Sequence, residues 1–323
     1  MKKILKYFAI FIASILMISL LAAVYISFKG IPSYEIQAIS YPVDYTKDRE
    51  LRGKKLVLML CANCHINRET GVLSGGIMHD APPEFGNIYA PNITQDEKYG
   101  IGEWTDAELA YLLRTGIKRD GSYAPPYMAK LPHMADEDIK AIISFLRSED
   151  RMVSPAPVPD RPVEPSFLTK LLTHVAFKPL PWPENEIMMP DTMDMVKLGK
   201  YLSHNLDCFS CHSADFKTND FLNPEKSKGY FAGGNMPLNM SGQIIVTPNL
   251  TPDEETGIGL WTEKQFVRTL KFGIKEGEPA IQYPMMPYVQ LSDREARAIY
   301  QYLRTIPPIK NKINRSITTS LEQ

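Results

Sequence analysis

The chain has 323 residues, of which 44% are hydrophobic and 23% are charged, and its formal net charge at pH 7 is −1. This hydrophobic content is typical of globular protein, and the length allows two ordinary domains with further segments beside them. The near-zero charge excludes the basic excess by which many nucleic-acid-binding chains attract phosphate, so no nucleic-acid partner is expected.

The first residues predict a membrane anchor, which we place at residues 1–33. Three lysines within the first six residues precede an uncharged, mostly apolar run at 7–28, and Lys29 follows it. A helix needs roughly 20 such residues to span a bilayer, and this run supplies them. Basic residues before the span predict a single pass through the inner membrane, with the N-terminus in the cytoplasm and the rest of the chain in the periplasm. The alternative is a cleaved signal peptide, whose apolar core is usually shorter.

Residues 34–150 are predicted to form a helical domain. Apolar residues at helical spacing predict one helix over 49–60. Thr105 with Glu108 has the pattern of a capping box at the start of a second, and Thr262 with Gln265 repeats this pattern later in the chain. A third is predicted over 136–147, where acidic residues in the first turn and an arginine in the last suit the helix dipole. Because no alternating run is long enough for a sheet, the expected fold class is all-α.

A cysteine motif follows the first of these helices. The pentapeptide Cys61-Ala-Asn-Cys64-His65 has the form C-x-x-C-H, the attachment signature of c-type haem. The two cysteines bond covalently to the porphyrin, and the histidine is held against the iron as its proximal ligand. A zinc site on the cysteine pair is the alternative, which the directly adjacent histidine disfavours.

A linker at 151–190 is rich in proline, which prevents a long regular helix and favours semi-rigid extended chain. It also contains large apolar residues, among them Phe167, Phe177 and Trp182, and is too apolar for a free tether. A short helix over 168–175 is predicted to pack between the two halves of the chain and to hold them in a fixed relation.

The second half, residues 191–310, repeats the first. The motif returns as Cys208-Phe-Ser-Cys211-His212, and the stretch at 90–105 returns 157 residues later. Both copies contain a Pro-Asn-(Ile/Leu)-Thr segment, a Gly-Ile-Gly-x-Trp segment and a closing helix. The repeat therefore predicts two tandem domains of one fold after the N-terminal helix, with two covalently bound haem c groups and their iron.

A haem electron carrier usually has a second axial ligand, and methionine is the one predicted here. Met128 lies in a proline-rich loop before the closing helix of the first half, which can present a thioether to a flat cofactor. In the second half the repeat alignment indicates Met285, whereas the Met-Pro-Tyr context favours Met286, and both remain candidates. Histidine is the competing ligand, with His133 as its best candidate.

Polar residues that recur in both copies are predicted to surround the haems. Haem propionates need hydrogen-bond donors, which asparagine amides and indole N–H groups supply. The candidates are Asn92, Trp104, Asn249 and Trp261. The alternative in each copy is a turn asparagine and a core tryptophan.

With these motifs the chain resembles the class I c-type cytochromes, in a membrane-anchored dihaem form. The resemblance rests on the two haem motifs, the methionine loops and the closing helices that end in Phe-Leu-Arg or Tyr-Leu-Arg. The repeated segments are similar to the cytochrome c subunits of membrane-bound alcohol and gluconate dehydrogenases, which carry three haem domains where this chain has two. The resemblance covers nearly all of 48–150 and 191–308, leaves a tail at 311–323 outside, and implies helical domains that wrap a haem with one edge exposed.

These features together predict a dihaem electron carrier on the periplasmic face of the membrane. Its expected partners are the membrane and redox proteins, with a dehydrogenase or quinol-linked donor and a terminal acceptor such as an oxidase. Methionine opposite histidine raises the reduction potential and fills the iron, so no catalytic residue is expected. The alternative is a dihaem peroxidase or another haem oxidoreductase with one open iron site, and a redox sensor is a third class.

Overall fold

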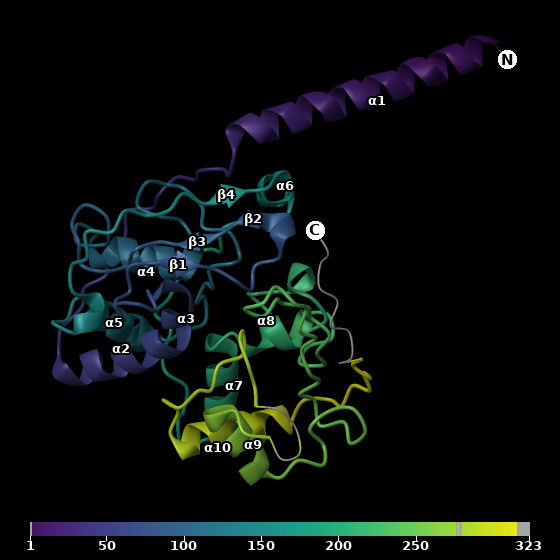
Figure 1. Ribbon diagram of the computed structural model, residues 1–323. Helices are drawn as coiled ribbons and strands as arrows, with labels where there is room; N and C mark the ends of the chain where they lie inside the picture. Colours follow the sequence, from purple (N-terminus) through teal and green to yellow (C-terminus); the bar gives the residue numbers. More distant parts are fainter. Residues whose placement is uncertain (1, 276, 278–279, 315–323) are drawn as a thin grey trace.

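The computed structural model describes residues 2–275, 277 and 280–314. It is mostly helical, which confirms the predicted fold class, and its two helical halves follow one N-terminal helix (Figure 1). Within the described residues, the strands are limited to four segments of two residues each. The molecule is therefore held together by helix packing and loop contacts.

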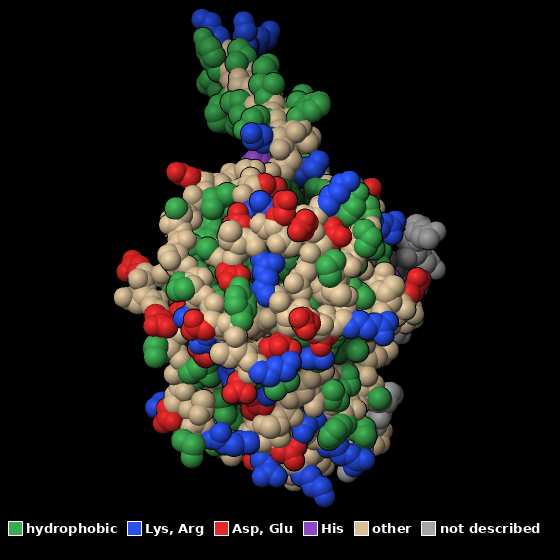
Figure 2. Space-filling view, turned by 90° about the vertical axis from the view of Figure 1, so that its left-hand side faces the viewer, with side chains coloured by type: hydrophobic (Ala, Val, Ile, Leu, Met, Phe, Trp, Pro, Cys, Tyr) green, Lys and Arg blue, Asp and Glu red, His purple; other side chains and the backbone are tan. Residues whose placement is uncertain are grey.

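The N-terminal helix α1 (Lys2–Lys29) extends away from the rest of the molecule. It is the one described helix that is long and apolar enough to cross a membrane, and none of its most apolar window is buried. Figure 2 shows it as an apolar column with lysines at its outer end. Length and composition thus agree with the predicted anchor, and a signal sequence passes the same test.

The first half and the adjoining start of the linker contain four helices, two short strand pairs and two 3-10 turns. These are α2 (Lys47–Leu60), α3 (Ala62–His65), α4 (Asp106–Thr115), α5 (Asp136–Leu146), β1 (Gly76–Ile77) antiparallel to β3 (Tyr89–Ala90), β2 (Gly86–Asn87) antiparallel to β4 (Glu164–Pro165), η1 (Pro83–Phe85) and η2 (Arg151–Val153). Helices α2 and α5 cross at Gly53, where a Cβ would overlap the carbonyl oxygen of Ala141. A glycine at this point lets the two helix backbones touch.

The second half repeats this arrangement without the strands among its described residues. Its elements are α7 (Met195–Asn205), α8 (Cys208–His212), α9 (Glu263–Phe272), α10 (Asp293–Leu303) and the 3-10 turns η3 (Phe216–Thr218) and η4 (Pro224–Lys226). Helices α7 and α10 cross at Gly199, where a Cβ would overlap the carbonyl oxygen of Ala298. Both helices that follow a tryptophan, α4 and α9, begin with the predicted capping box.

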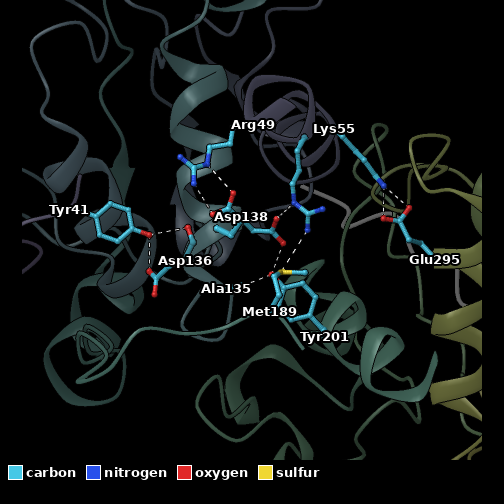
Figure 3. A network of polar contacts seen from close by, with 11 residues as sticks. Tyr41, Arg49, Lys55, Ala135, Asp136, Asp138, Met189, Tyr201 and Glu295 are labelled. Atoms are coloured by element: carbon cyan, nitrogen blue, oxygen red, sulfur yellow. Dashed lines mark hydrogen bonds and ion pairs between the residues drawn. The ribbon is translucent and has the colours of Figure 1, made fainter. Parts of the chain in front are cut away.

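The two halves share one apolar core and direct polar contacts. Buried side chains of α2 and α5 belong to the same cluster as those of α7 and α10. Between the halves, Tyr201 of α7 donates from its hydroxyl to Asp138 of α5 at 2.6 Å and accepts from the backbone N–H of Ala135 at 3.0 Å. Lys55 of α2 pairs with Glu295 of α10 (Figure 3). These contacts fix the relative placement of the halves.

The linker contains the predicted short helix, α6 (Phe167–Val175), but that helix does not pack between the halves. Its main contacts are with α1 and η1, at the end of the molecule where α1 leaves the body (Figure 1). The reason is local hydrogen bonding, because the hydroxyls of Ser166 and Thr169 donate to backbone oxygens of Glu84 and Phe85.

Candidate haem-binding sites

A single cavity of about 1390 Å³ is lined by both halves of the molecule. Its lining includes all six cysteines and histidines of the two motifs: Cys61, Cys64, His65, Cys208, Cys211 and His212. A site for one drug-sized molecule usually occupies roughly 300–1,000 Å³. The cavity is therefore larger than one such ligand needs, and it joins the two motifs in one continuous space.

The histidine of each motif is oriented by a backbone carbonyl. Nδ1 of His65 donates to the carbonyl oxygen of Pro91 at 2.8 Å, and Nδ1 of His212 donates to that of Pro248 at 3.1 Å. Burial lowers the pKa of both rings, although the hydrogen bonds act in the opposite direction. A neutral ring with its proton on Nδ1 leaves the Nε2 lone pair free for a metal, so both histidines fit a proximal iron ligand.

A glycine in each half lets the motif pack against the segment that carries this proline. The N–H of Gly75 donates to the carbonyl of His65 at 2.9 Å, and Gly233 makes the same bond to His212 at 2.7 Å. Gly75 has a positive φ, and a Cβ there would lie 2.5 Å from the carbonyl oxygen of Ala90. Only glycine allows this approach without strain, which explains the Gly-Gly pairs that recur in the sequence.

The four cysteines are unlike reactive or metal-binding thiolates. Burial raises the pKa of each thiol to about 12, so all four are protonated at neutral pH. Among the residues that the structure describes, no group of three or more His, Cys, Asp or Glu side chains is placed to hold a metal ion. The lack of such a ligand group in the described residues disfavours the zinc alternative.

The methionine candidates differ in their surroundings. Met128 and Met285 both line the cavity. Met286 is 44% exposed and is not among the lining residues. The structure therefore supports the repeat alignment, which indicates Met285, over the local Met-Pro-Tyr context.

The four histidines outside the motifs each have another contact. Nε2 of His133 lies 3.0 Å from the carbonyl oxygen of Phe221, and His204 contacts the hydroxyl of Tyr230. His174 contacts the backbone near the end of α1, and the ring of His79 packs edge to face on Tyr283. None of them is among the residues that line the cavity, so the structure gives no support to a histidine as distal ligand.

The asparagines line the cavity, but their amides bind the protein itself. Nδ2 of Asn92 donates to the carbonyl oxygens of Ala156 and Val158 at 2.9 and 3.1 Å, and that of Asn249 donates to Ile309 at 2.7 Å. Each side-chain oxygen accepts from a threonine two residues on. This geometry favours the alternative of a turn asparagine, which holds the proline segment of each half in place. Trp104 and Trp261 also line the cavity.

An equivalent pair of lysines, absent from the predicted site residues, lies in the cavity wall. Lys118 and Lys275 occupy equivalent positions in the two halves, 157 residues apart, and both belong to the lining. Their ammonium groups are suitable partners for haem propionates. The signal was present in the sequence, because Gly-Ile-Lys recurs in both copies directly after the helix that follows the tryptophan.

The two motifs approach a common carboxylate, Asp80. Burial is the main cause of the raised pKa of Cys64 and Cys211, and the negative charge of Asp80 adds to the shift in both. Asp80 therefore lies within electrostatic range of both halves. Asp80 also accepts a hydrogen bond from the hydroxyl of Tyr283 at 2.6 Å, and its backbone N–H donates to the same hydroxyl at 3.2 Å. A loop of the first half thus meets the methionine loop of the second.

Two C-x-x-C-H motifs on a repeated helical fold, each with a carbonyl-oriented histidine on a shared cavity, define a c-type haem protein. The sequence model of the cytochrome c family matches residues 51–150 and 196–307, and the chain belongs to that family. The chain therefore binds haem c covalently and transfers electrons.

Similar proteins include two dehydrogenase subunits and a dihaem cytochrome. The fructose dehydrogenase cytochrome subunit of Gluconobacter japonicus is 30% identical over 79% of this chain and 52% of its own length. The cytochrome c subunit of the quinone alcohol dehydrogenase of Gluconacetobacter polyoxogenes is 30% identical over 77% and 54%. A diheme cytochrome c-type protein of Cereibacter sphaeroides is 29% identical over 77% and 83%. The chain thus spans about half the length of the two dehydrogenase subunits.

Proposed function

We propose that the protein is a dihaem cytochrome c that passes single electrons between redox proteins at a membrane surface. The observation that carries this is one cavity lined by both haem motifs and by a methionine from each half. The proposed residues are Cys61, Cys64, His65 and Met128 for the first haem, and Cys208, Cys211, His212 and Met285 for the second.

The chain supplies attachment, orientation and exclusion of water at each site. When bound, haem c supplies an iron that gains and loses one electron. Pro91 and Pro248 hold the two histidines in the tautomer that binds iron, and burial of both rings keeps water from that side. Met128 and Met285 would each supply a thioether ligand, which would raise the reduction potential and exclude other ligands from the iron.

We propose further that α1 stays attached as a single-pass anchor in the inner membrane, with both haem halves in the periplasm. The lysines before the apolar run support this orientation. Packing of α6 against α1 supports retention over cleavage, because a cleaved segment needs no contact with the mature fold. N-terminal sequencing of the mature protein distinguishes the two, since a start near residue 30 contradicts the anchor.

A dehydrogenase or a quinol-linked enzyme is the proposed electron donor, with a terminal acceptor downstream. The support is the similarity to chains named as cytochrome subunits of fructose and alcohol dehydrogenases. Copurification from mildly solubilised membranes tests it. Isolation of the chain with no dehydrogenase or other redox protein contradicts a stable complex.

Two measurements on the purified holoprotein test the haem assignment. A pyridine haemochrome assay is expected to give two haems per chain, and spectra of the oxidised protein are expected to show low-spin iron with a methionine–iron charge-transfer band. The reduced protein should bind carbon monoxide slowly or not at all. A high-spin ferrous haem that binds carbon monoxide rapidly contradicts the closed sites and favours the peroxidase alternative.

A further inference from the structure

Helix α6 buries its threonines, whereas its apolar residues are half-buried or exposed. Its threonines Thr169 and Thr173 are almost fully buried, and Thr169 Oγ1 donates to the carbonyl oxygen of Phe85 at 2.7 Å. Five apolar residues spaced for one helix face form what we call the α6 stripe: Phe167, Leu168, Leu171, Leu172 and Val175. The ends of this stripe are the most open, with Phe167 45% and Val175 65% exposed. A helix on a water-facing surface normally has the opposite arrangement.

The same helix is fixed against the last turn of α1. Nε2 of His174 lies 3.0 Å from the carbonyl oxygen of Gly30, and Nζ of Lys170 donates to that of Ser27 at 3.2 Å. The rings of Tyr25 and His174 meet edge to face with 6.3 Å between centroids. The threonines face η1 and the basic residues face α1, so the α6 stripe is the remaining, outward side.

The length of α1 sets the level of this contact in a bilayer. Its 28 residues rise about 42 Å, whereas a hydrocarbon core is about 30 Å thick and needs roughly 20 residues. Counted from Lys6, the last basic residue of the cytoplasmic end, roughly 20 residues reach Ile26. The α1 residues that contact α6 therefore lie at the outer membrane–water interface, where Phe28 is exposed as well.

We propose that α6 is an interfacial membrane helix, whose stripe inserts at the headgroup level of the bilayer that α1 spans. The proposal rests on the proposed anchor. The α6 stripe adjoins the exposed apolar surface of α1, so one lipid surface covers both. Interfacial helices bind through such a buried apolar face. With two attachments the haem halves cannot rotate freely about α1, and the same face stays turned toward the membrane.

Lipid photo-cross-linking of the full-length holoprotein tests this in vesicles of phosphatidylcholine and phosphatidylglycerol without any other protein. p-Benzoylphenylalanine is introduced singly at Leu16 in α1, at Phe167 and Val175 in the α6 stripe, and at Phe272. Phe272 is the matched control, because it is an exposed phenylalanine at the end of α9, on the part of the molecule far from α1 (Figure 1). Haem absorption spectra identify variants that fold.

Lipid adducts are counted by mass spectrometry after illumination. We expect adducts at Leu16, Phe167 and Val175, and at least tenfold fewer at Phe272. No adduct at Leu16 overturns the anchor itself and with it the proposal. If Leu16 forms adducts but Phe167 and Val175 form no more than Phe272 does, the anchor stands and the proposal for α6 is overturned.

Discussion

The adjacent residues Met285 and Met286 have different surroundings, and the difference predicts which one binds iron. Met285 lines the cavity, whereas Met286 does not line it and is 44% exposed. We expect Met285→Ala to remove the methionine–iron charge-transfer band of one haem and to lower its potential by on the order of 100 mV, since axial ligands set haem potentials over about 0.8 V. Met286→Ala, the matched control, should leave the charge-transfer band and the potential unchanged. The reverse outcome assigns the ligand to Met286.

A second residue-scale prediction concerns Asp136, which joins two segments of the first half to the linker. Its carboxylate accepts from Arg114 at 2.8 Å, from Tyr41 at 2.7 Å and from the backbone N–H of Ile187 at 2.7 Å. Burial acts to raise its pKa, but these hydrogen bonds outweigh burial and hold the pKa below the ordinary value. A carboxyl with a lowered pKa stabilises the fold above its unfolded pKa of about 3.9, and that stability is lost as pH falls through the folded pKa.

We therefore expect the free energy of unfolding to decrease as the pH falls below about 4. Asp136→Asn should lower the free energy of unfolding by roughly 1–3 kcal/mol at pH 7, because hydrogen bonds to a charged group are lost. The variant should also lose less stability than the wild type as the pH falls, which flattens the acid limb of its stability curve. Denaturant unfolding at several pH values measures both, with the exposed Asp48→Asn as control. An unchanged acid limb in Asp136→Asn contradicts the role of this carboxyl.

Among the elements, the paired helix crossings give the sharpest prediction. Gly53→Ala places a methyl group against the carbonyl oxygen of Ala141, and a backbone oxygen cannot move without separating α2 from α5. We expect a loss of roughly 1–3 kcal/mol or more in stability. Leu51→Ala, on the exposed face of the same helix, should have much less effect. Equal midpoints of thermal unfolding for the two variants contradict the crossing.

The sequence predicts elements well where the signal is local. Apolar spacing and the Thr105 and Thr262 capping boxes place α4 and α9, and the closing helices end within a residue of their predicted limits. The packing partner of α6 was predicted wrongly, because its threonines are buried while its apolar side chains are half-buried or exposed, which reverses the usual pattern. The glycine crossings were also missed, since a single glycine inside a helix shows no partner in the sequence.

At the scale of the whole molecule, the sequence indicates the number of haem motifs but not their shared cavity. Each half follows from the repeat, and two contacts that join the halves occupy equivalent positions, since Tyr201 with Asp138 corresponds to Lys55 with Glu295. The residue types differ, however, and Tyr283 with Asp80 has no equivalent pair because Pro126 stands at the position that matches Tyr283. Contacts of this kind are set by three-dimensional packing, so only the structure brings Cys64 and the second motif to one space.

The shared cavity predicts that the two haems influence one another's reduction potentials. Charges in a low-dielectric space interact more strongly than in water, so an electron on one haem lowers the reduction potential of the other by on the order of tens of mV.

The variants Met128→Ala and Met285→Ala measure this interaction. Each substitution lowers the potential of one haem, so the unaltered haem is reduced while its neighbour is still oxidised. The potentials of the unaltered haems in the two variants are added. Their sum should exceed the sum of the two wild-type potentials by the interaction potential between the haems. Added salt should change this excess little, since buried pairs are weakly screened. Equal sums in a potentiometric titration contradict coupling and indicate that the haems are reduced independently.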